Sequence, residues 1–529
     1  MDGEAVRTAG SGLGLVVPSI RLPDDYARLE HFCQLARDGV AGFIVYLGDD
    51  ELLPAFLRAL RKAAGRPLLL MSDVECGVGQ QVQGCVELPP LLSVGAAGSE
   101  ERAYQHGRCT ALEARRIGLN VLLGPVVDVL SRIDNPIVGP RSFGSNPELV
   151  AQLAQAWVQG AQDQGVLACA KHFPGHGHTH QDSHEELPTV HASRDQLMRR
   201  ELVPFRRVIQ AGVASVMSAH VAYPGLTGDE SRPATLSPEI LKTLLRDEFG
   251  FGGLVISDAL TMRGFTDVAG DGEFDEGAAA VAAVAAGCDL LLGPVDPRGV
   301  AAALDAAHAA AQLDLLDPQG RLLLTIADLP GEEGLEGSVD DPSSPQTLGE
   351  HAYVSYGLAR DSVTCLANDV NLLPLDVSGR SVMALVVDDD DDSERHAEIA
   401  ERREEFSGGY ASRRNWTGRG NSEDEALLEL AQEADLILLP IFCATRAYKG
   451  RAGLRPELAR LVLDVLDVAP SKTVCIVHGG PAVLIPLGIL PATVVSAWGG
   501  APVCVRAALD VVLTGSPLRG VDPSPPESV

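Results

Sequence analysis

The sequence predicts an α/β protein in which a (β/α)8 barrel of the TIM type precedes a smaller, open α/β domain. Three observations lead to this fold class. A short apolar run followed by a longer amphipathic stretch recurs eight times in the first ~330 residues. Ionisable residues end several of these runs, and a second series of alternations follows a segment rich in Gly, Pro, Ser and acidic residues. The chain, at 529 residues, is also longer than one hydrophobic core normally supports.

The eight expected barrel strands are rich in β-branched and other apolar residues, and each precedes a helical stretch. A count of eight fits a closed barrel better than an open doubly wound sheet. The strands are GLVVPS (14–19), GFIVYL (42–47), PLLLMSD (67–73), VLLGPVVD (121–128), VLACAKHF (166–173), SVMSAHV (215–221), LVISD (254–258) and DLLLGP (289–294).

Polar residues at the carboxyl ends of these strands predict the position of a site. In a (β/α)8 barrel the loops after the strands open at one end and surround a shared pocket. We therefore expect the following side chains to face that pocket: Asp73, Asp128, Lys171 with His172, His220 and Asp258.

The domain organisation follows from a change in composition. We expect a barrel domain at 1–335, a linker at 336–352, an α/β domain at 353–520 and a disordered tail at 521–529. In the second domain we expect strands at SVMALVVD (381–388), DLILLPIF (435–442), KTVCIVHG (472–479) and ATVVSAWG (492–499), with helices at 423–434 and 455–466. The acidic run Asp388–Asp392 is interpreted as a solvated loop.

Charge and composition exclude several classes of partner. Lys and Arg total 42 against 72 Asp and Glu, so the net charge of -30 disfavours binding to nucleic acid or to an anionic membrane. The N-terminal segment lacks the pattern of a signal peptide, and no apolar stretch is long enough to predict a membrane span. The ten cysteines are scattered without a CxxC spacing. We therefore expect a cytoplasmic protein with reduced thiols.

The segment KHFPGHGHTHQDSHEELP, residues 171–188, carries the densest group of unusual side chains. Its glycines and prolines predict a loop, which presents Lys171, His172, Asp182 and His184 to the pocket. One interpretation pairs Asp182 with His184, so that the carboxylate orients an imidazole that donates and retakes a proton near neutral pH.

Two other interpretations of this segment stay open. It is either a histidine-rich surface loop or a metal site, since histidines alternate with small or polar residues at His176, His178, His180 and His184. The spacing matches neither H-E-x-x-H nor a helical i, i+4 pair, and the prediction is that no metal or other cofactor is bound. The histidines at 178 and 180 have no assigned role.

Asp258 ends an apolar strand in the segment GFGGLVISDALTM. A carboxylate in this position is a nucleophile, a metal ligand or the N-cap of the following helix, and the residue alone does not distinguish these roles.

Taken together, these segments resemble glycoside hydrolase family 3, and specifically its β-N-acetylglucosaminidase branch. KHFPGHG followed shortly by DSH is similar to the signature of that branch. The resemblance is strongest from about residue 67 to 295 and continues more faintly through VTCLANDVNLLPL, which resembles the start of the α/β sandwich domain of two-domain members. Further similar segments occur in the same order: GPVVDV (124–129), NPIVGPRSFGSNP (135–147), MSAHVAYPGL (217–226) and GFGGLVISDALTM (250–262).

The resemblance implies a role for each candidate residue. It makes Asp258 the nucleophile of a retaining glycosidase and His184 its general acid and base, with Asp182 behind the imidazole. The remaining residues are expected to bind the sugar. Lys171 and His172 bind its hydroxyls, Asp73 binds its far hydroxyls, and Arg141 lies beside the N-acetyl or a neighbouring hydroxyl group. His220, which also follows a strand, is expected to contact the substrate as well.

The expected function is that of an exo-β-N-acetylhexosaminidase acting on small N-acetylglucosamine glycosides, in peptidoglycan recycling or amino-sugar catabolism. A phosphorylase is an alternative, because a histidine in place of a carboxylate acid/base repels phosphate less. An inactive sugar-binding homologue is a second alternative. The family's D-Q-E-G-G-R motif is here Asp73-Val74-Glu75-Cys76-Gly77-Val78 without the arginine, so aglycone contacts beyond the first sugar differ. The oligomeric state stays open.

Overall fold

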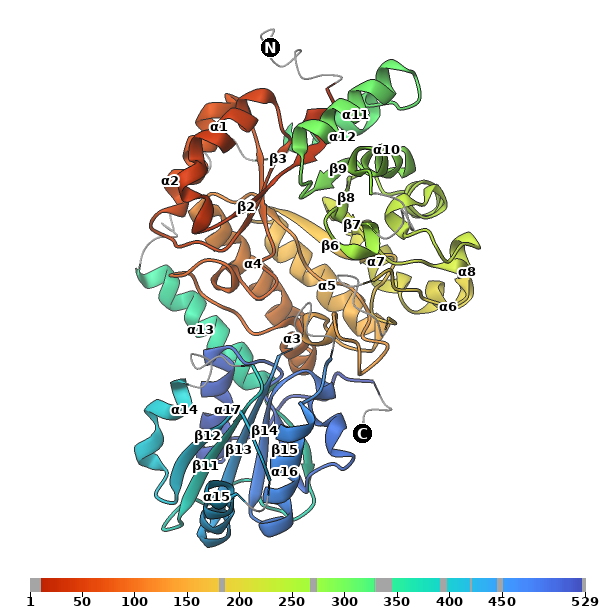
Figure 1. The fold of residues 1–529 in the computed structure, drawn as a ribbon. Helices are drawn as coiled ribbons and strands as arrows, with labels where there is room; N and C mark the ends of the chain where they lie inside the picture. Colours follow the sequence, from red (N-terminus) through yellow and green to blue (C-terminus); the bar gives the residue numbers. More distant parts are fainter. Residues whose placement is uncertain are drawn as a thin grey trace. The chain divides into compact units, whose positions relative to one another are not determined.

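The computed structural model describes residues 11–179, 186–266, 274–327, 329, 345–390, 397–418, 421–444 and 451–525. Contacts divide the chain into two compact units (Figure 1). The first consists of 1–86, 103–129 and 150–351, and the second of 87–102, 130–149 and 352–529. Two short pieces of the N-terminal half therefore belong to the second unit. Within the described ranges, no helix has both the length and the apolar character required to cross a membrane.

The first unit is built on a nearly closed ring of nine parallel strands, which confirms the predicted barrel. Pro18 interrupts the first expected strand and divides it in two. The first piece pairs with the last strand of the ring and the second piece with the third, so the ring closes through this interruption. The strands are β1 (Val16–Val17), β2 (Ser19–Arg21), β3 (Gly42–Tyr46), β4 (Leu69–Ser72), β5 (Val121–Leu122), β6 (Leu167–Phe173), β7 (Ser215–Ser218), β8 (Leu254–Ala259) and β9 (Leu290–Leu292).

Helices surround this ring (Figure 1), as expected when parallel strands are joined by crossover connections. The larger ones that lie wholly or mainly in the first unit are α1 (Leu29–Asp38), α2 (Leu53–Ala64), α4 (Glu100–Ile117), α5 (Pro147–Gln162), α7 (Leu202–Gln210), a π-helix (Glu239–Glu248), α10 (Glu276–Ala286), α11 (Pro297–Ala309) and α12 (Leu316–Ala327).

Glycines allow the closest backbone approaches in this unit. A Cβ atom on Gly107 of α4 would lie 2.2 Å from the carbonyl oxygen of Trp157, and one on Gly160 of α5 would lie 2.1 Å from that of Tyr104. Helices α4 and α5 therefore cross with their backbones in direct contact, which no larger residue permits at either position.

The second unit is an α/β sandwich, as the resemblance implies. Its six-stranded sheet has the order β10-β15-β14-β13-β11-β12, in which only β10 is antiparallel. Four strands match the predicted ones: β11 (Val382–Asp388), β13 (Leu436–Cys443), β14 (Thr473–Gly479) and β15 (Thr493–Ser496). The sequence did not reveal the two edge strands, β10 (Thr364–Asn368) and β12 (Gly409–Arg413).

Each face of this sheet has its own hydrophobic core. Along β11, Met383, Leu385 and Val387 belong to the core that includes α15 (Ser422–Glu433) and α16 (Pro456–Val468). The alternate residues of β11 belong to the core that includes α14 (Ala397–Glu401) and α17 (Pro502–Thr514). This alternation follows from the two-residue period of a strand, and Figure 1 shows the helices on both sides of the sheet.

Two findings bear on the predicted linker and tail. Helix α13 (Pro345–Ser362) begins inside the stretch 336–352 that the sequence assigns to a linker. In the expected tail, the backbone N–H of Val521 donates to Ala96, and the carbonyl of Pro523 accepts from Ser145. The four domain boundaries themselves stay a prediction.

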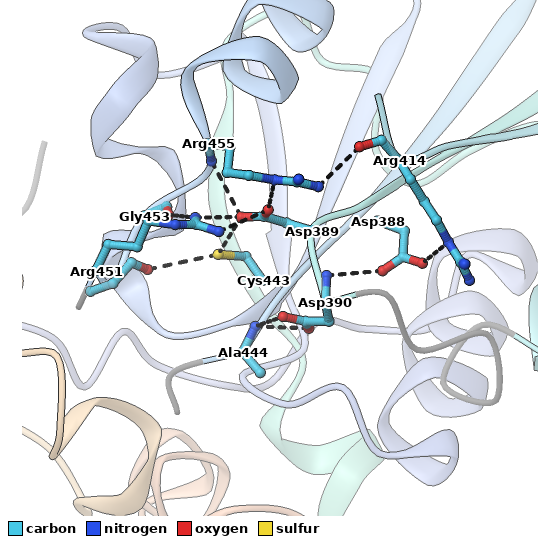
Figure 2. A network of polar contacts seen from close by, with 10 residues as sticks. Asp388, Asp389, Asp390, Arg414, Cys443, Ala444, Arg451, Gly453 and Arg455 are labelled. Atoms are coloured by element: carbon cyan, nitrogen blue, oxygen red, sulfur yellow. Dashed lines mark hydrogen bonds and ion pairs between the residues drawn. The ribbon is translucent and has the colours of Figure 1, made fainter. Parts of the chain in front are cut away.

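The acidic run after β11 is not a solvated loop throughout, which corrects the interpretation of its first residues. Figure 2 shows the Asp389 carboxylate, whose side chain is fully buried, between two guanidinium groups. Arg451 Nη1 lies 2.5 Å from Asp389 Oδ2, and Arg455 Nε lies 2.5 Å from Oδ1. Asp388 pairs with Arg414 at 2.9 Å. The sequence pattern missed these pairs because the arginines lie 26 to 66 residues further along the chain.

Candidate active site

The carboxyl ends of barrel strands β4, β6 and β8 carry the candidate residues of the first unit. Asp73 directly follows β4, Lys171 and His172 directly precede the last residue of β6, and Asp258 is the penultimate residue of β8. Because all strands of the ring are parallel, these residues lie at the same end of the barrel.

Lys171 is the centre of a buried ion-pair group. Its Nζ lies 2.7 Å from Asp73 Oδ1 and 2.5 Å from Glu75 Oε1, and only 2% of its side chain is exposed. An ammonium removed from water requires such partners, and two carboxylates leave the group with a net negative charge. Glu75 was not among the predicted site residues. Its place two residues after Asp73 was the available signal.

Asp128 fixes the backbone of the loop that begins at Lys171. Its fully buried carboxylate accepts hydrogen bonds from the backbone N–H of His172, at 3.1 Å, and of His176, at 2.7 Å. It also contacts Nδ1 of the His172 ring at 2.7 Å. Burial alone would raise the pKa of Asp128, but the neighbouring charge of His172 and these hydrogen bonds hold it below its ordinary value.

The first half of the histidine-rich segment is ordered by local bonds. Gly175 has φ +130°, a conformation that favours glycine, and its carbonyl accepts a hydrogen bond from the Tyr223 hydroxyl at 2.9 Å. Nδ1 of His176 lies 2.9 Å from the hydroxyl of Thr179. Gly175 and the hydroxyl groups of Tyr223 and Thr179 therefore stabilise the chain where it turns away from β6.

His178, which had no predicted role, contacts an arginine. Nη2 of Arg200 donates to Nδ1 of His178 at 2.8 Å, and Nε of the same arginine pairs with Glu201 at 2.7 Å. An Nδ1 that accepts from a guanidinium leaves the ring proton on Nε2 in the neutral form. The second unexplained histidine, His180, lies outside the described residues.

Asp258 and His220 are connected through the end of β8. Asp258 Oδ1 accepts from the backbone N–H of Ala259 at 2.8 Å. His220 places Nε2 at 3.1 Å from the carbonyl of Ala259 and Nδ1 at 2.8 Å from the Thr235 hydroxyl. Its ring also packs on Phe265, with centroids 4.9 Å apart. Nε2 of His220 therefore contacts the backbone next to Asp258, while Thr235 holds the other ring nitrogen.

The thiol of Cys169 lies near enough to Lys171, Asp73 and Asp258 for their charges to affect its pKa. This thiol is buried inside the barrel below the strand ends, and this burial raises its pKa to about 12. The charge of Lys171 lowers the pKa, while the charges of Asp73 and Asp258 raise it further. Charged groups at the ends of β4, β6 and β8 therefore all affect the pKa of one thiol, as expected if the three strand ends face a common space.

Three predicted residues are not brought into this group by the described structure. Asp182 and His184 lie outside the described residues. Arg141 belongs to the second compact unit, where it ends a short 3-10 helix (Gly139–Arg141) and donates from Nη1 to the carbonyl of Ile137 at 3.2 Å. The roles of these three residues stay predictions.

No group of three or more His, Cys, Asp or Glu side chains within the described ranges is arranged to hold a metal ion. The ring of His176 contacts the hydroxyl of Thr179, and the ring of His178 contacts the guanidinium of Arg200. His180 and His184 fall outside those ranges, so a metal site in the whole segment is tested by adding a chelator to the activity assay.

Comparison with known proteins identifies the family of the barrel. Residues 34–317 match the glycosyl hydrolase family 3 N-terminal domain, which is just over half of the chain. The chain is 36% identical over 280 residues to the β-hexosaminidase of Tolumonas auensis, covering 51% of this chain and 81% of that protein. It is also 36% identical over 290 residues to the β-hexosaminidase of Thiobacillus denitrificans, covering 53% and 77%.

Solved structures extend the similarity to both units. A family 3 β-N-acetylglucosaminidase from Paenibacillus sp. FPU-7 superposes with a TM-score of 0.82 at 27% identity, covering 98% of this chain and 99% of that one. A β-glucoside phosphorylase superposes with a TM-score of 0.84 at 22% identity, covering 100% and 98%, and so shares the fold. The matched barrel, the carboxylates at its strand ends and the relatives together show that the chain belongs to glycoside hydrolase family 3, with the β-hexosaminidases of that family.

Proposed function

We propose that this protein is a retaining exo-β-N-acetylhexosaminidase that removes terminal β-linked N-acetylglucosamine through a covalent glycosyl-enzyme intermediate. The observation that carries the proposal is the position of Asp258, a carboxylate at the end of β8 in the same ring of strand ends as the Lys171 ion-pair group. The β-hexosaminidase relatives support the choice of sugar.

In the proposed reaction Asp258 attacks the anomeric carbon while His184 protonates the departing oxygen. His184 then takes a proton from water, which attacks the intermediate and releases the sugar with its β configuration retained. Asp182 accepts the imidazole N–H and stabilises its protonated form.

The proposed sugar-binding groups are charged and already oriented. Lys171 donates to a sugar hydroxyl while it stays paired with Asp73 and Glu75, and Asp73 accepts from a second hydroxyl. Asp128 holds the His172 ring through Nδ1, which directs Nε2 toward the sugar. Arg141 is proposed beside the acetamido group. Terminal N-acetylglucosamine on peptidoglycan fragments or chitin oligosaccharides, handled in the cytoplasm, provides the substrate class.

The test is incubation of the pure protein with an aryl β-N-acetylglucosaminide, with and without phosphate, followed by NMR of the first sugar product. We expect free β-N-acetylglucosamine in both cases, and no effect of a chelator. A sugar 1-phosphate that forms only with phosphate would instead establish a phosphorylase. No product in either mixture would show that the protein is not a catalyst of this class.

The variant Asp258→Asn tests the nucleophile. The amide cannot form the glycosyl ester, so we expect kcat to fall by roughly a thousandfold or more while the melting temperature changes little. Asp247→Asn, an exposed carboxylate on the preceding π-helix, is the matched control and should retain full activity. Normal turnover by Asp258→Asn would assign the nucleophile elsewhere.

A further inference from the structure

The barrel has a cavity at the end opposite the candidate active site. Leu68 lies in its wall and directly precedes β4, whereas Asp73 directly follows the same strand. Asn120, also in the wall, directly precedes β5. The cavity has a volume of about 770 Å³, and all its lining residues belong to the first compact unit.

Cationic side chains dominate the lining of this cavity. Of its sixteen described lining residues six are Lys or Arg and none is Asp or Glu. This is the reverse of the whole chain, where 42 cationic residues stand against 72 acidic ones. The six come from the ends of two helices and from the connection that precedes β4: Arg58, Arg61 and Lys62 of α2, Arg66, and Arg115 and Arg116 of α4.

Helix-end stabilisation explains part of this arrangement. Cations are favourable near the carboxyl end of a helix, and both α2 and α4 have two in their last turn. Arg61 donates to the carbonyl of Gly118 and Arg115 to that of Gln164. Arg116 pairs with Asp50 at 3.0 Å. These three side chains therefore have roles within the fold.

Arg58, Lys62 and Arg66 differ from these three, although Lys62 also lies in the last turn of α2. None of the three forms an ion pair with any carboxylate in the part of the chain that the structure describes. Arg58 and Lys62 are exposed at positions i and i+4 of α2, where like charges repel and destabilise a helix. Arg66 donates from Nη2 to the carbonyl of Val40 at 2.5 Å, but its guanidinium is half-buried, and this burial lowers its pKa. An anion between these groups would relieve both the repulsion and the desolvation.

Apart from Asn120, the rest of the wall is mainly apolar, with contributions from Pro54, Leu68, Ile117 and Ile326. We propose that this cavity is a binding site for a small, multiply charged phosphate-bearing ligand, held by Arg58, Lys62 and Arg66. Guanidinium groups match the geometry of phosphate oxygens, and the apolar wall accommodates the organic part of a phosphate ester. Chemistry in this barrel fold takes place at the other end, so the ligand is bound here and not converted.

The test is titration calorimetry of the full chain with pyrophosphate, at low salt and at about 0.15 M salt. We expect one ion per chain, with an affinity that falls as salt is added. The double variant Arg58→Gln/Lys62→Gln should weaken binding on the order of tenfold or more, because it removes two charged contacts. Arg58→Gln alone should give a smaller loss. Neither should lower the melting temperature, since both side chains are exposed and form no ion pair among the described residues.

The matched control is Lys242→Gln/Arg403→Gln, which removes the same charge from two exposed cations elsewhere. It should bind pyrophosphate as the native protein does. Citrate, a carboxylate of similar charge, should bind more weakly. The proposal is wrong if the native protein does not bind pyrophosphate or binds citrate as tightly. It is also wrong if both double variants lose affinity equally, or if Arg58→Gln/Lys62→Gln binds normally. The last result would place the ion at the sugar site.

Discussion

The carboxylate of Asp128 shows how one buried side chain determines a local conformation. It accepts two backbone N–H groups and contacts a histidine ring, so Asp128→Asn would place an NH2 group against these donors. We expect the free energy of unfolding at pH 7 to fall by about 2–4 kcal/mol. Urea denaturation measures it, with Asp247→Asn on an exposed surface as the control that should be neutral.

The same residue predicts a pH dependence. Because the folded state lowers the pKa of Asp128, the native protein gains stability from its charge above the ordinary pKa of about 4. This gain is lost as the pH falls through the lowered value. The difference between native protein and Asp128→Asn should therefore narrow at acid pH. A constant difference in urea denaturation would show that the charge of Asp128 does not contribute.

Residues of the candidate site differ in how far the sequence could predict them. Asp73, Lys171, His172 and Asp258 were visible because each ends an apolar strand. The partnership of Glu75 with Lys171 was not, since the two are separated by almost a hundred positions and no local pattern relates them. His220 was expected to bind substrate, but the described contacts of its ring nitrogens are with Thr235 and a backbone carbonyl.

At the level of elements, the crossing of α4 and α5 depends on glycine. Alanine normally stabilises a helix relative to glycine by up to about 1 kcal/mol. At Gly107 the added methyl would lie 2.2 Å from a backbone oxygen, so Gly107→Ala should instead lower the free energy of unfolding by about 1–3 kcal/mol. Gly320→Ala in α12, with no atom within 4 Å of the new methyl, should be neutral or stabilising. Equal effects in thermal unfolding would contradict the direct helix contact.

Strand β14 places a second titratable group in the core. His478 stacks on Phe442 with centroids 4.5 Å apart, and burial lowers its pKa to about 4. The unfolded chain binds a proton near pH 6.5, so stability should fall as the pH drops from 6.5 to about 4, by about 3 kcal/mol in total. His478→Gln should flatten this slope in urea denaturation, while His191→Gln, on an exposed loop, should leave it unchanged.

Buried central strands could be predicted from the sequence, whereas edge strands could not. The sequence predicted all eight barrel strands and four strands of the second sheet, because each is a continuous apolar run buried on both faces. Strand β12 was not predicted because its sequence, GYASR, has no apolar alternation, and its residues are exposed or only partly buried. Strand β10 is the antiparallel edge, and Pro18, which divides the first barrel strand, was included in one continuous predicted strand.

On the scale of the whole molecule, the two compact units are interleaved in sequence. Trp498 packs in a small core with Leu92, Ala96, Leu130 and Val138, all from the N-terminal half of the chain. A fragment that ends at residue 351 should therefore expose these apolar side chains. We expect it to aggregate or bind a hydrophobic dye in size-exclusion and fluorescence measurements, and the fragment 352–529 to lack a native circular dichroism melt. Two well-behaved fragments would show that the inserted pieces are dispensable.

The interleaving also constrains how the protein is made. During synthesis, the pieces 87–102 and 130–149 leave the ribosome about two hundred residues before the C-terminal part with which they pack. At typical elongation rates this delay is on the order of ten to forty seconds. For at least that time the apolar surface of α3 (Leu91–Ala97) lacks Trp498, its partner from the C-terminal part. We therefore expect the nascent chain to depend on a chaperone that keeps this surface from aggregating.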